Sequence, residues 1–149
     1  MCCILDSSGK RESSFYIKGG REYANASRQI YDRIKRSEDV QGGGGNAKAN
    51  YRYWKKLKNL HEHYAHQISR QIIDYCKIQN ASILALPEYN KDYGNIILAS
   101  VGKNSPLRLV PSIREKLKYK AWQEGIVVLE VQQHNINSVS VSYTHLRAH

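Results

Sequence analysis

Long apolar runs are what this 149-residue sequence most plainly lacks. No stretch of about 18 apolar residues occurs, which argues against a membrane-spanning helix, and the amino terminus carries no signal-peptide pattern. Cysteine is scarce: Cys2 and Cys3 are adjacent and Cys76 stands alone, which excludes a disulfide framework and a four-cysteine zinc site. We therefore expect a cytoplasmic protein with reduced thiols, and we place Cys76 in a helix that packs into the core.

Acidic residues are also few. The chain holds 23 Lys and Arg against 13 Asp and Glu, which gives a net charge of +10. Phosphates attract clustered cations and release counterions when they bind, so this imbalance favours a nucleic-acid partner over a membrane surface. Hydrophobic residues make up 41% of the chain, which is typical of a folding protein, and the length suits one domain or part of one.

The first half of the chain predicts a β-hairpin followed by two helices. Short runs at 1–5 and 13–17 flank a turn-forming Asp-Ser-Ser-Gly cluster, which predicts the hairpin. Apolar residues then recur every three or four positions over 21–37 and over 47–79, as in amphipathic helices. The glycine-rich run 41–46 is predicted to be a loop between them, because consecutive glycines cost too much backbone entropy inside a helix.

The second half predicts a strand, a helix and a strand. The apolar run 82–86 is too short for a helix and suits a strand buried on both faces of a sheet, which Pro87 would end. Pro111 fits the first turn of a helix, Gly125 closes that helix, and 126–131 is a second buried strand. This order predicts an α/β domain in which the last two strands are parallel.

The last nine residues, 141–149, carry no fold signal and resemble a translated sequencing adapter. The codons GTC TCT TAT ACA CAT CTC CGA GCC CAC encode them in order. We therefore expect the native sequence to end near Val139, and we divide the chain into a domain at 1–139 and an adapter-derived tail at 140–149. A natural basic tail is the alternative.

Three segments before the tail carry a family resemblance. They are the basic helix with Tyr-Trp-Lys-Lys-Leu-Lys-Asn-Leu at 53–60 and His-Gln-Ile-Ser-Arg-Gln-Ile-Ile at 66–73, the strand Ile-Leu-Ala-Leu-Pro-Glu at 83–88, and Leu-Lys-Tyr-Lys-Ala at 117–121 followed by Gly-Ile-Val-Val at 125–128. In order and spacing they resemble the RuvC-like nuclease domain of transposon-encoded OrfB-type RNA-guided nucleases and related type V CRISPR effectors. The resemblance implies an α/β, partial RNase H-like (RuvC-like) fold with a hairpin, two helices and then strand-helix-strand.

The family's outer motifs are not found. An Asp-x-Gly strand would precede the hairpin in such proteins, and a Cys-x-x-Cys zinc ribbon and a third catalytic Asp would follow 132–138; none of these occurs at those positions. The resemblance therefore implies a domain clipped at both ends, with structural zinc expected only in the missing carboxyl-terminal part.

Glu88 is the residue that matches the family's second catalytic carboxylate. Two-metal phosphodiester hydrolysis needs several carboxylates around paired Mg²⁺ ions, so the resemblance implies a catalytic and metal-binding role for Glu88. The alternative is a solvent-facing loop glutamate. Because Glu88 alone cannot hold two metals, we expect the complete relative to cut DNA with Mg²⁺ and a guide RNA, and this chain to be inactive alone.

Basic residues on the long helix are the candidate nucleic-acid contacts. They are Arg52, Lys55, Lys56, Lys58 and Arg70. These cations fall mostly off the apolar stripe and could meet phosphates, although solvated helix charge is the alternative for each. The rival function is a small basic nucleic-acid-binding module without catalytic ancestry, and a third possibility is a degenerate relative that binds targets without cutting.

His61, His63 and His66 form a cluster in sequence. At about 100° per residue, His61 and His63 lie roughly 200° apart on a helix, and only His63 and His66 share a side. A three-histidine metal site on this helix is therefore disfavoured. We expect all three residues at the surface or facing nucleic acid.

Overall fold

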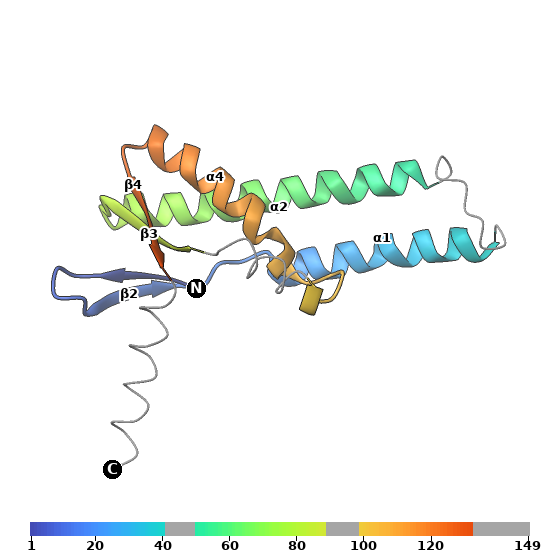
Figure 1. The fold of residues 1–149 in the computed structure, drawn as a ribbon, viewed down its shortest axis with the longest axis horizontal. Coiled ribbons are helices and arrows are strands. Elements are labelled where there is room, and N and C mark those ends of the chain that lie inside the picture. The colour runs from blue at the N-terminus through green and yellow to red at the C-terminus, as the bar shows by residue number, and fades with distance from the viewer. Residues whose placement is uncertain (41–49, 89–98, 133–149) are drawn as a thin grey trace, which may run out of the picture.

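The computed structural model describes residues 1–40, 50–88 and 99–132. They form a small mixed α/β domain with two two-stranded sheets and three α-helices (Figure 1). In chain order the elements are β1 (Cys2–Leu5), β2 (Arg11–Phe15), α1 (Gly20–Val40), α2 (Tyr51–Ile78), β3 (Ile83–Glu88), the 3₁₀-helix η1 (Pro106–Leu109), α4 (Val110–Gln123) and β4 (Val127–Gln132). The predicted order of elements is confirmed, while the glycine-rich run 41–46 and the tail 140–149 lie outside the described residues.

The hairpin forms at the predicted turn. Strands β1 and β2 pair antiparallel, and Asp6 Oδ1 accepts hydrogen bonds from the backbone N–H and the hydroxyl of Ser8, at 2.8 and 2.6 Å. Gly9 completes the turn with a φ of +80°, a conformation that glycine adopts without strain. The hairpin docks on α2 because the rings of Phe15 and Tyr75 stack with their centroids 5.2 Å apart.

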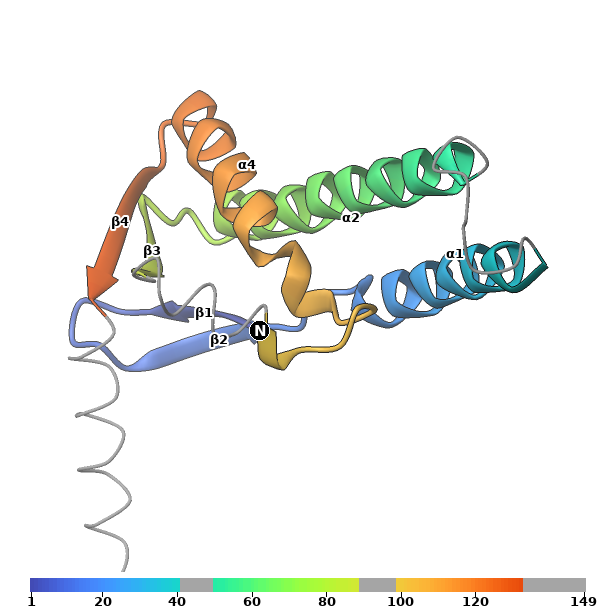
Figure 2. The ribbon, with the colours of Figure 1, turned by 45° about the vertical axis from the view of Figure 1, so that its right-hand side comes forward.

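Helices α1 and α2 lie side by side and run in opposite directions (Figures 1 and 2). Aromatic edge-to-face contacts join them at two levels, between Tyr23 and Tyr64 at 5.7 Å and between Tyr31 and Trp54 at 6.0 Å. None of the helices in the described ranges is long and apolar enough to cross a membrane.

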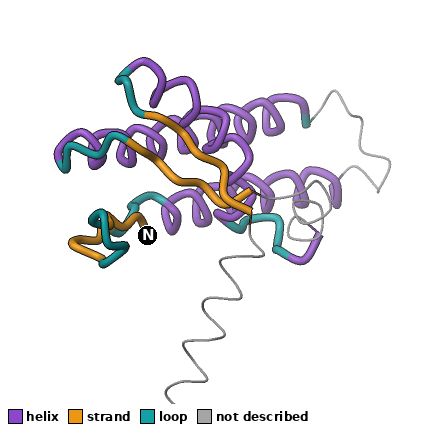
Figure 3. The backbone as a smooth tube through the Cα atoms, turned by 60° about the vertical axis from the view of Figure 1, so that its left-hand side comes forward, coloured by secondary structure: helices purple, strands orange, loops and turns teal. Residues whose placement is uncertain are grey.

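The second sheet consists of β3 and β4, which pair in parallel as predicted (Figure 3). Helix α4 connects them along the chain, with Pro111 in its first turn, where a proline needs no hydrogen-bonded N–H. Gly125 follows the helix with a φ of +70°, which confirms its predicted role as the closing residue.

Strand β3 is longer than the sequence predicted. Pro87 does not end it, because Pro87 pairs with Val131 and Glu88 with Gln132. Among the described strands β3 has β4 as its sole partner, and an edge strand tolerates a residue that cannot donate a backbone hydrogen bond. Glu88 is therefore the last residue of a strand and not the first residue of a loop.

The prediction that both strands are buried on both faces is wrong. Leu84 is 7% exposed and packs into the core under α2 and α4, but Ile83 and Val127 on the opposite face are 56% and 55% exposed, and Leu129 is 47% exposed. Side chains alternate between the faces of a strand, so helices on one side cover every second residue. The described residues place helices against one face of this sheet and leave an apolar face open.

The core lies where α2, η1 and α4 meet the covered face of the sheet. Its most buried members are Ile73, Cys76, Leu109, Leu117 and Ala121, each at most 2% exposed. Burying an aliphatic side chain of this size stabilises the fold by about 1.5 to 3 kcal/mol. The predicted placement of Cys76 is confirmed, since its side chain belongs to the same cluster.

The two sheets stay separate and leave a cavity between them. It measures about 710 Å³ and is lined by residues of β1 on one side and of β3 on the other. Strand β1 pairs with β2 alone and β3 with β4 alone among the described strands. Each of the two facing strands therefore has an unpaired edge.

Candidate functional site

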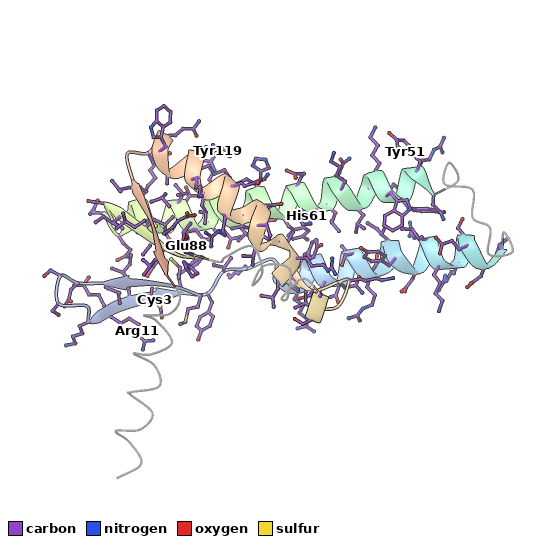
Figure 4. The ribbon with its side chains drawn as sticks, in the orientation of Figure 1. Cys3, Arg11, Tyr51, His61, Glu88 and Tyr119 are labelled. Carbon is purple, nitrogen blue, oxygen red and sulfur yellow. The ribbon has the colours of Figure 1, made fainter. Side chains whose placement is uncertain are left out.

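Glu88 lies at the carboxyl end of β3, the end at which parallel α/β sheets usually carry their functional groups. Its side chain is exposed. The neighbouring carbonyl of Pro87 accepts a hydrogen bond from the guanidinium of Arg114 on α4, which ties this end of the strand to the helix. In Figure 4, Glu88 lies between the helices and the hairpin, whereas Tyr51 marks the far end of α2.

Other metal ligands do not gather around Glu88 within the described ranges. No group of three or more His, Cys, Asp or Glu side chains there could hold a metal ion. Asp92, the next acidic residue along the chain after Glu88, lies outside the described residues. A single exposed carboxylate does not fit a two-metal centre, so the described residues by themselves form no Mg²⁺ site.

The five predicted nucleic-acid contacts are all exposed on α2. At about 100° per residue, Arg52, Lys56 and Arg70 lie within about 40° of one another around the helix axis. Measured around the helix axis from Arg52, Lys55 lies at about 60° and Lys58 at about 120°, both in the same direction. The helix thus carries a basic stripe, which we define as Arg52, Lys55, Lys56 and Arg70, and Lys58 lies off it.

His61 is not the surface residue that the sequence predicted. Its Nε2 lies 3.0 Å from Ser112 Oγ on α4, and its ring meets the Tyr23 ring edge-on at 6.2 Å. Burial in this contact lowers the pKa of His61 below its ordinary value, since desolvation disfavours the charged imidazolium. The sequence could not show this because Tyr23 and Ser112 come from other elements.

His63 and His66 share a side of α2, as predicted, and line a groove between α2 and α4. This α2–α4 groove has a volume of about 410 Å³ and also contains Arg70, Tyr119 and Lys120. Figure 4 labels Tyr119 on α4, the helix that packs against α2. Sequence reasoning identified Arg70 but missed the two α4 residues.

Lys120 is fixed in place by α2. Its Nζ donates hydrogen bonds to Ser69 Oγ at 2.7 Å and to the His66 carbonyl at 2.9 Å. Partial burial, and next the nearby charge of Arg70, lower the pKa of Lys120 below its ordinary value. Two cations from different helices are therefore held close together at this groove.

No protein-family model, curated protein or solved structure matches the chain.

Cys2 and Cys76 form a second polar contact, away from the groove. A hydrogen bond between the two thiols, with the amino-terminal charge adding to it, lowers the pKa of Cys2 to about 7. The same contact and burial raise the pKa of Cys76. Both residues are free thiols, as predicted, and their contact joins β1 to α2.

Proposed function

We propose that this chain is part of the RuvC-like domain of an OrfB-type RNA-guided DNA endonuclease, acting in the cytoplasm. The observation that carries the proposal is Glu88 at the carboxyl end of β3, next to a parallel strand that is reached through α4. A carboxylate at a strand end is held by the sheet in a fixed position, which is what metal-dependent hydrolysis requires of its ligands.

The cavity between β1 and β3 supports an RNase H-like arrangement. Among the described strands β1 and β3 each pair on one edge only, and both line this space, so the backbone N–H and C=O groups of β3 ahead of Pro87 could pair with one additional strand. The family resemblance implies a strand with Asp-x-Gly before the hairpin. A strand in this cavity would lie beside β3 and bring that Asp toward the end that carries Glu88.

Phosphodiester hydrolysis with paired Mg²⁺ ions needs more carboxylates than the described residues assemble. We therefore expect the 149-residue chain to bind nucleic acid without cutting it.

Resequencing the genomic locus on both sides of the reading frame is the direct test. We expect the frame to extend upstream into Asp-x-Gly and, past Val139, into paired Cys-x-x-Cys motifs with a further Asp. Native DNA that encodes 141–149 and starts the frame at Met1 would remove the support for the nuclease.

A second test uses the reconstructed full-length protein. Glu88→Ala should abolish Mg²⁺-dependent DNA cleavage while guide and target binding stay unchanged, and Glu115→Ala, an exposed glutamate on α4, is the matched control. Cleavage that survives Glu88→Ala would contradict the catalytic assignment.

The second candidate function is a basic nucleic-acid-binding module without catalysis. The basic stripe favours it, as does the fact that no group of metal ligands forms around Glu88 among the residues that the structure describes. The two candidates differ at Glu88: in a binding module, its replacement changes nothing measurable in any version of the protein.

A further inference from the structure

Three of the four cations on α4 form ion pairs with glutamates, and the fourth forms hydrogen bonds to uncharged groups instead. Lys116 forms an ion pair with Glu62 at 2.7 Å, and Arg114 and Lys118 both reach Glu130, each at 2.8 Å. The fourth cation, Lys120, instead donates hydrogen bonds to a hydroxyl and a carbonyl of α2, and it lines the α2–α4 groove together with Arg70.

Acidic charge in the groove is already engaged. Glu124, the carboxylate that lines it, forms an ion pair with Lys77 at 2.7 Å. Arg70 forms no ion pair with any other residue in the described ranges. The like charges of Arg70 and Lys116 act on Lys120 more strongly than the opposing charge of Asp74 on α2, and an anion placed between Arg70 and Lys120 would relieve the repulsion between them.

An aromatic ring borders the same groove. Tyr119 is 44% exposed, and its hydroxyl lies 3.4 Å from His66 Nδ1, which holds the ring over the groove. A half-exposed aromatic ring beside two cations offers a stacking surface next to a phosphate site. Proteins bind single-stranded nucleic acids with this combination.

We propose that the α2–α4 groove binds a phosphate between Arg70 and Lys120 and stacks the adjoining unpaired base on Tyr119. The inference rests on the proposed function for the class of ligand, and it specifies single-stranded nucleic acid, because bases in a duplex are stacked on each other and not open to Tyr119. The volume of about 410 Å³ falls within the range of pockets that hold small organic groups.

The basic stripe gives the strand a path to the groove. Arg52 and Lys56 lie on the same side of α2 as Arg70, and the 18 residues from Arg52 to Arg70 span about 27 Å of helix. Phosphates along a single strand could contact the stripe and end in the groove.

The test is a fluorescence-anisotropy titration of the whole chain with a labelled oligodeoxythymidylate of about 12 nucleotides. Arg70→Gln should weaken binding about tenfold and lower the salt dependence by about one phosphate contact. Tyr119→Leu should weaken binding about tenfold, whereas Tyr119→Phe, which keeps the ring and loses only the hydroxyl contact with His66, should bind more tightly than Tyr119→Leu.

Two controls separate the groove from general positive charge. Arg28→Gln makes the same change on an exposed face of α1 and should leave affinity within about twofold of the original chain. Poly-glutamate should not displace the oligonucleotide at concentrations at which unlabelled single strand does, and a duplex of the same length should bind independently of Tyr119.

The outcomes are distinct. If Arg70→Gln binds the oligonucleotide as tightly as the original chain, or loses no more affinity than Arg28→Gln, the groove is not the binding site for single strands. The proposed nuclease lineage is unaffected by that result. If poly-glutamate competes equally or duplex binding depends on Tyr119, the site is not specific for single strands. If the chain binds no nucleic acid, this inference is overturned, and the locus and Glu88 experiments still decide the nuclease proposal separately.

Discussion

The two halves of α2 differ in what surrounds them. All six buried residues of the helix lie in its carboxyl-terminal half, from Ala65 to Cys76, where α4, η1 and the sheet pack around it. The amino-terminal half, from Tyr51 to Tyr64, has none; it packs on α1 and displays most of the basic stripe. One continuous helix thus anchors the fold at one end and presents charge at the other.

The largest expected effect comes from the anchored half. Ile73→Ala removes a side chain that is 2% exposed and should lower the free energy of unfolding by about 3 kcal/mol, through lost burial and a cavity that the core cannot refill. Urea denaturation measures this change. Ile78→Ala is the matched control, since Ile78 is 76% exposed and should change stability by less than about 0.5 kcal/mol. Equal losses from both would contradict the assigned core.

A smaller effect is expected where the halves meet. Glu62→Gln leaves Lys116, which is 9% exposed, without its carboxylate and should cost about 1 to 2 kcal/mol, a value held down by the exposure of Glu62. The hydrogen bond from Lys116 lowers the pKa of Glu62 below its ordinary 4.5. When the pKa of a carboxyl is lower in the folded state than in the unfolded state, the carboxylate stabilises the fold at pH values above its unfolded-state pKa. This stabilisation is lost as the pH falls through the folded-state pKa.

The pH dependence therefore sharpens the Glu62 prediction. The stability difference between the original chain and Glu62→Gln should be full near neutral pH and shrink below pH 4.5. Urea denaturation at several pH values measures it, with Glu115→Gln as the exposed control on α4. A difference that does not vary with pH would mean that the ion pair does not stabilise the fold.

The smallest effect is expected in the charge-displaying half. Trp54→Ala removes the edge-to-face contact with Tyr31, but Trp54 is 47% exposed, so the loss should be about 1 kcal/mol. Hydrogen exchange should accelerate near this end of α1 and α2 and stay slow around Ile73. Faster exchange throughout α2 would show instead that the two halves of the helix unfold together.

Local patterns predicted most of the elements correctly. The spacing of apolar residues located α1 and α2, and the turn residues Asp6, Gly9 and Gly125 located the ends of strands and helices, because each acts on its own few neighbours. The errors have a different origin. The extension of β3 through Pro87 depends on its being an edge strand, which no local signal records.

The candidate site was only partly predictable for the same reason. Arg70 stood out as a cation on an amphipathic helix, and the helical angle between His63 and His66 correctly placed them together. Nothing near Tyr119 or Lys120 in the sequence marks them as partners of that surface, because they meet it through the crossing of α4 over α2.

The amino-acid sequence was enough to give the order of the elements, the excess of positive charge and the exposure of the basic stripe. These follow from composition and from the spacing of apolar residues, every second residue in strands and every third or fourth in helices. Tertiary structure alone decided which face of β3 and β4 is covered, that His61 turns inward to Ser112, and that Arg70 and Lys120 share one groove. Those features depend on how elements distant in the chain pack against each other, and packing is settled by the fit of whole surfaces.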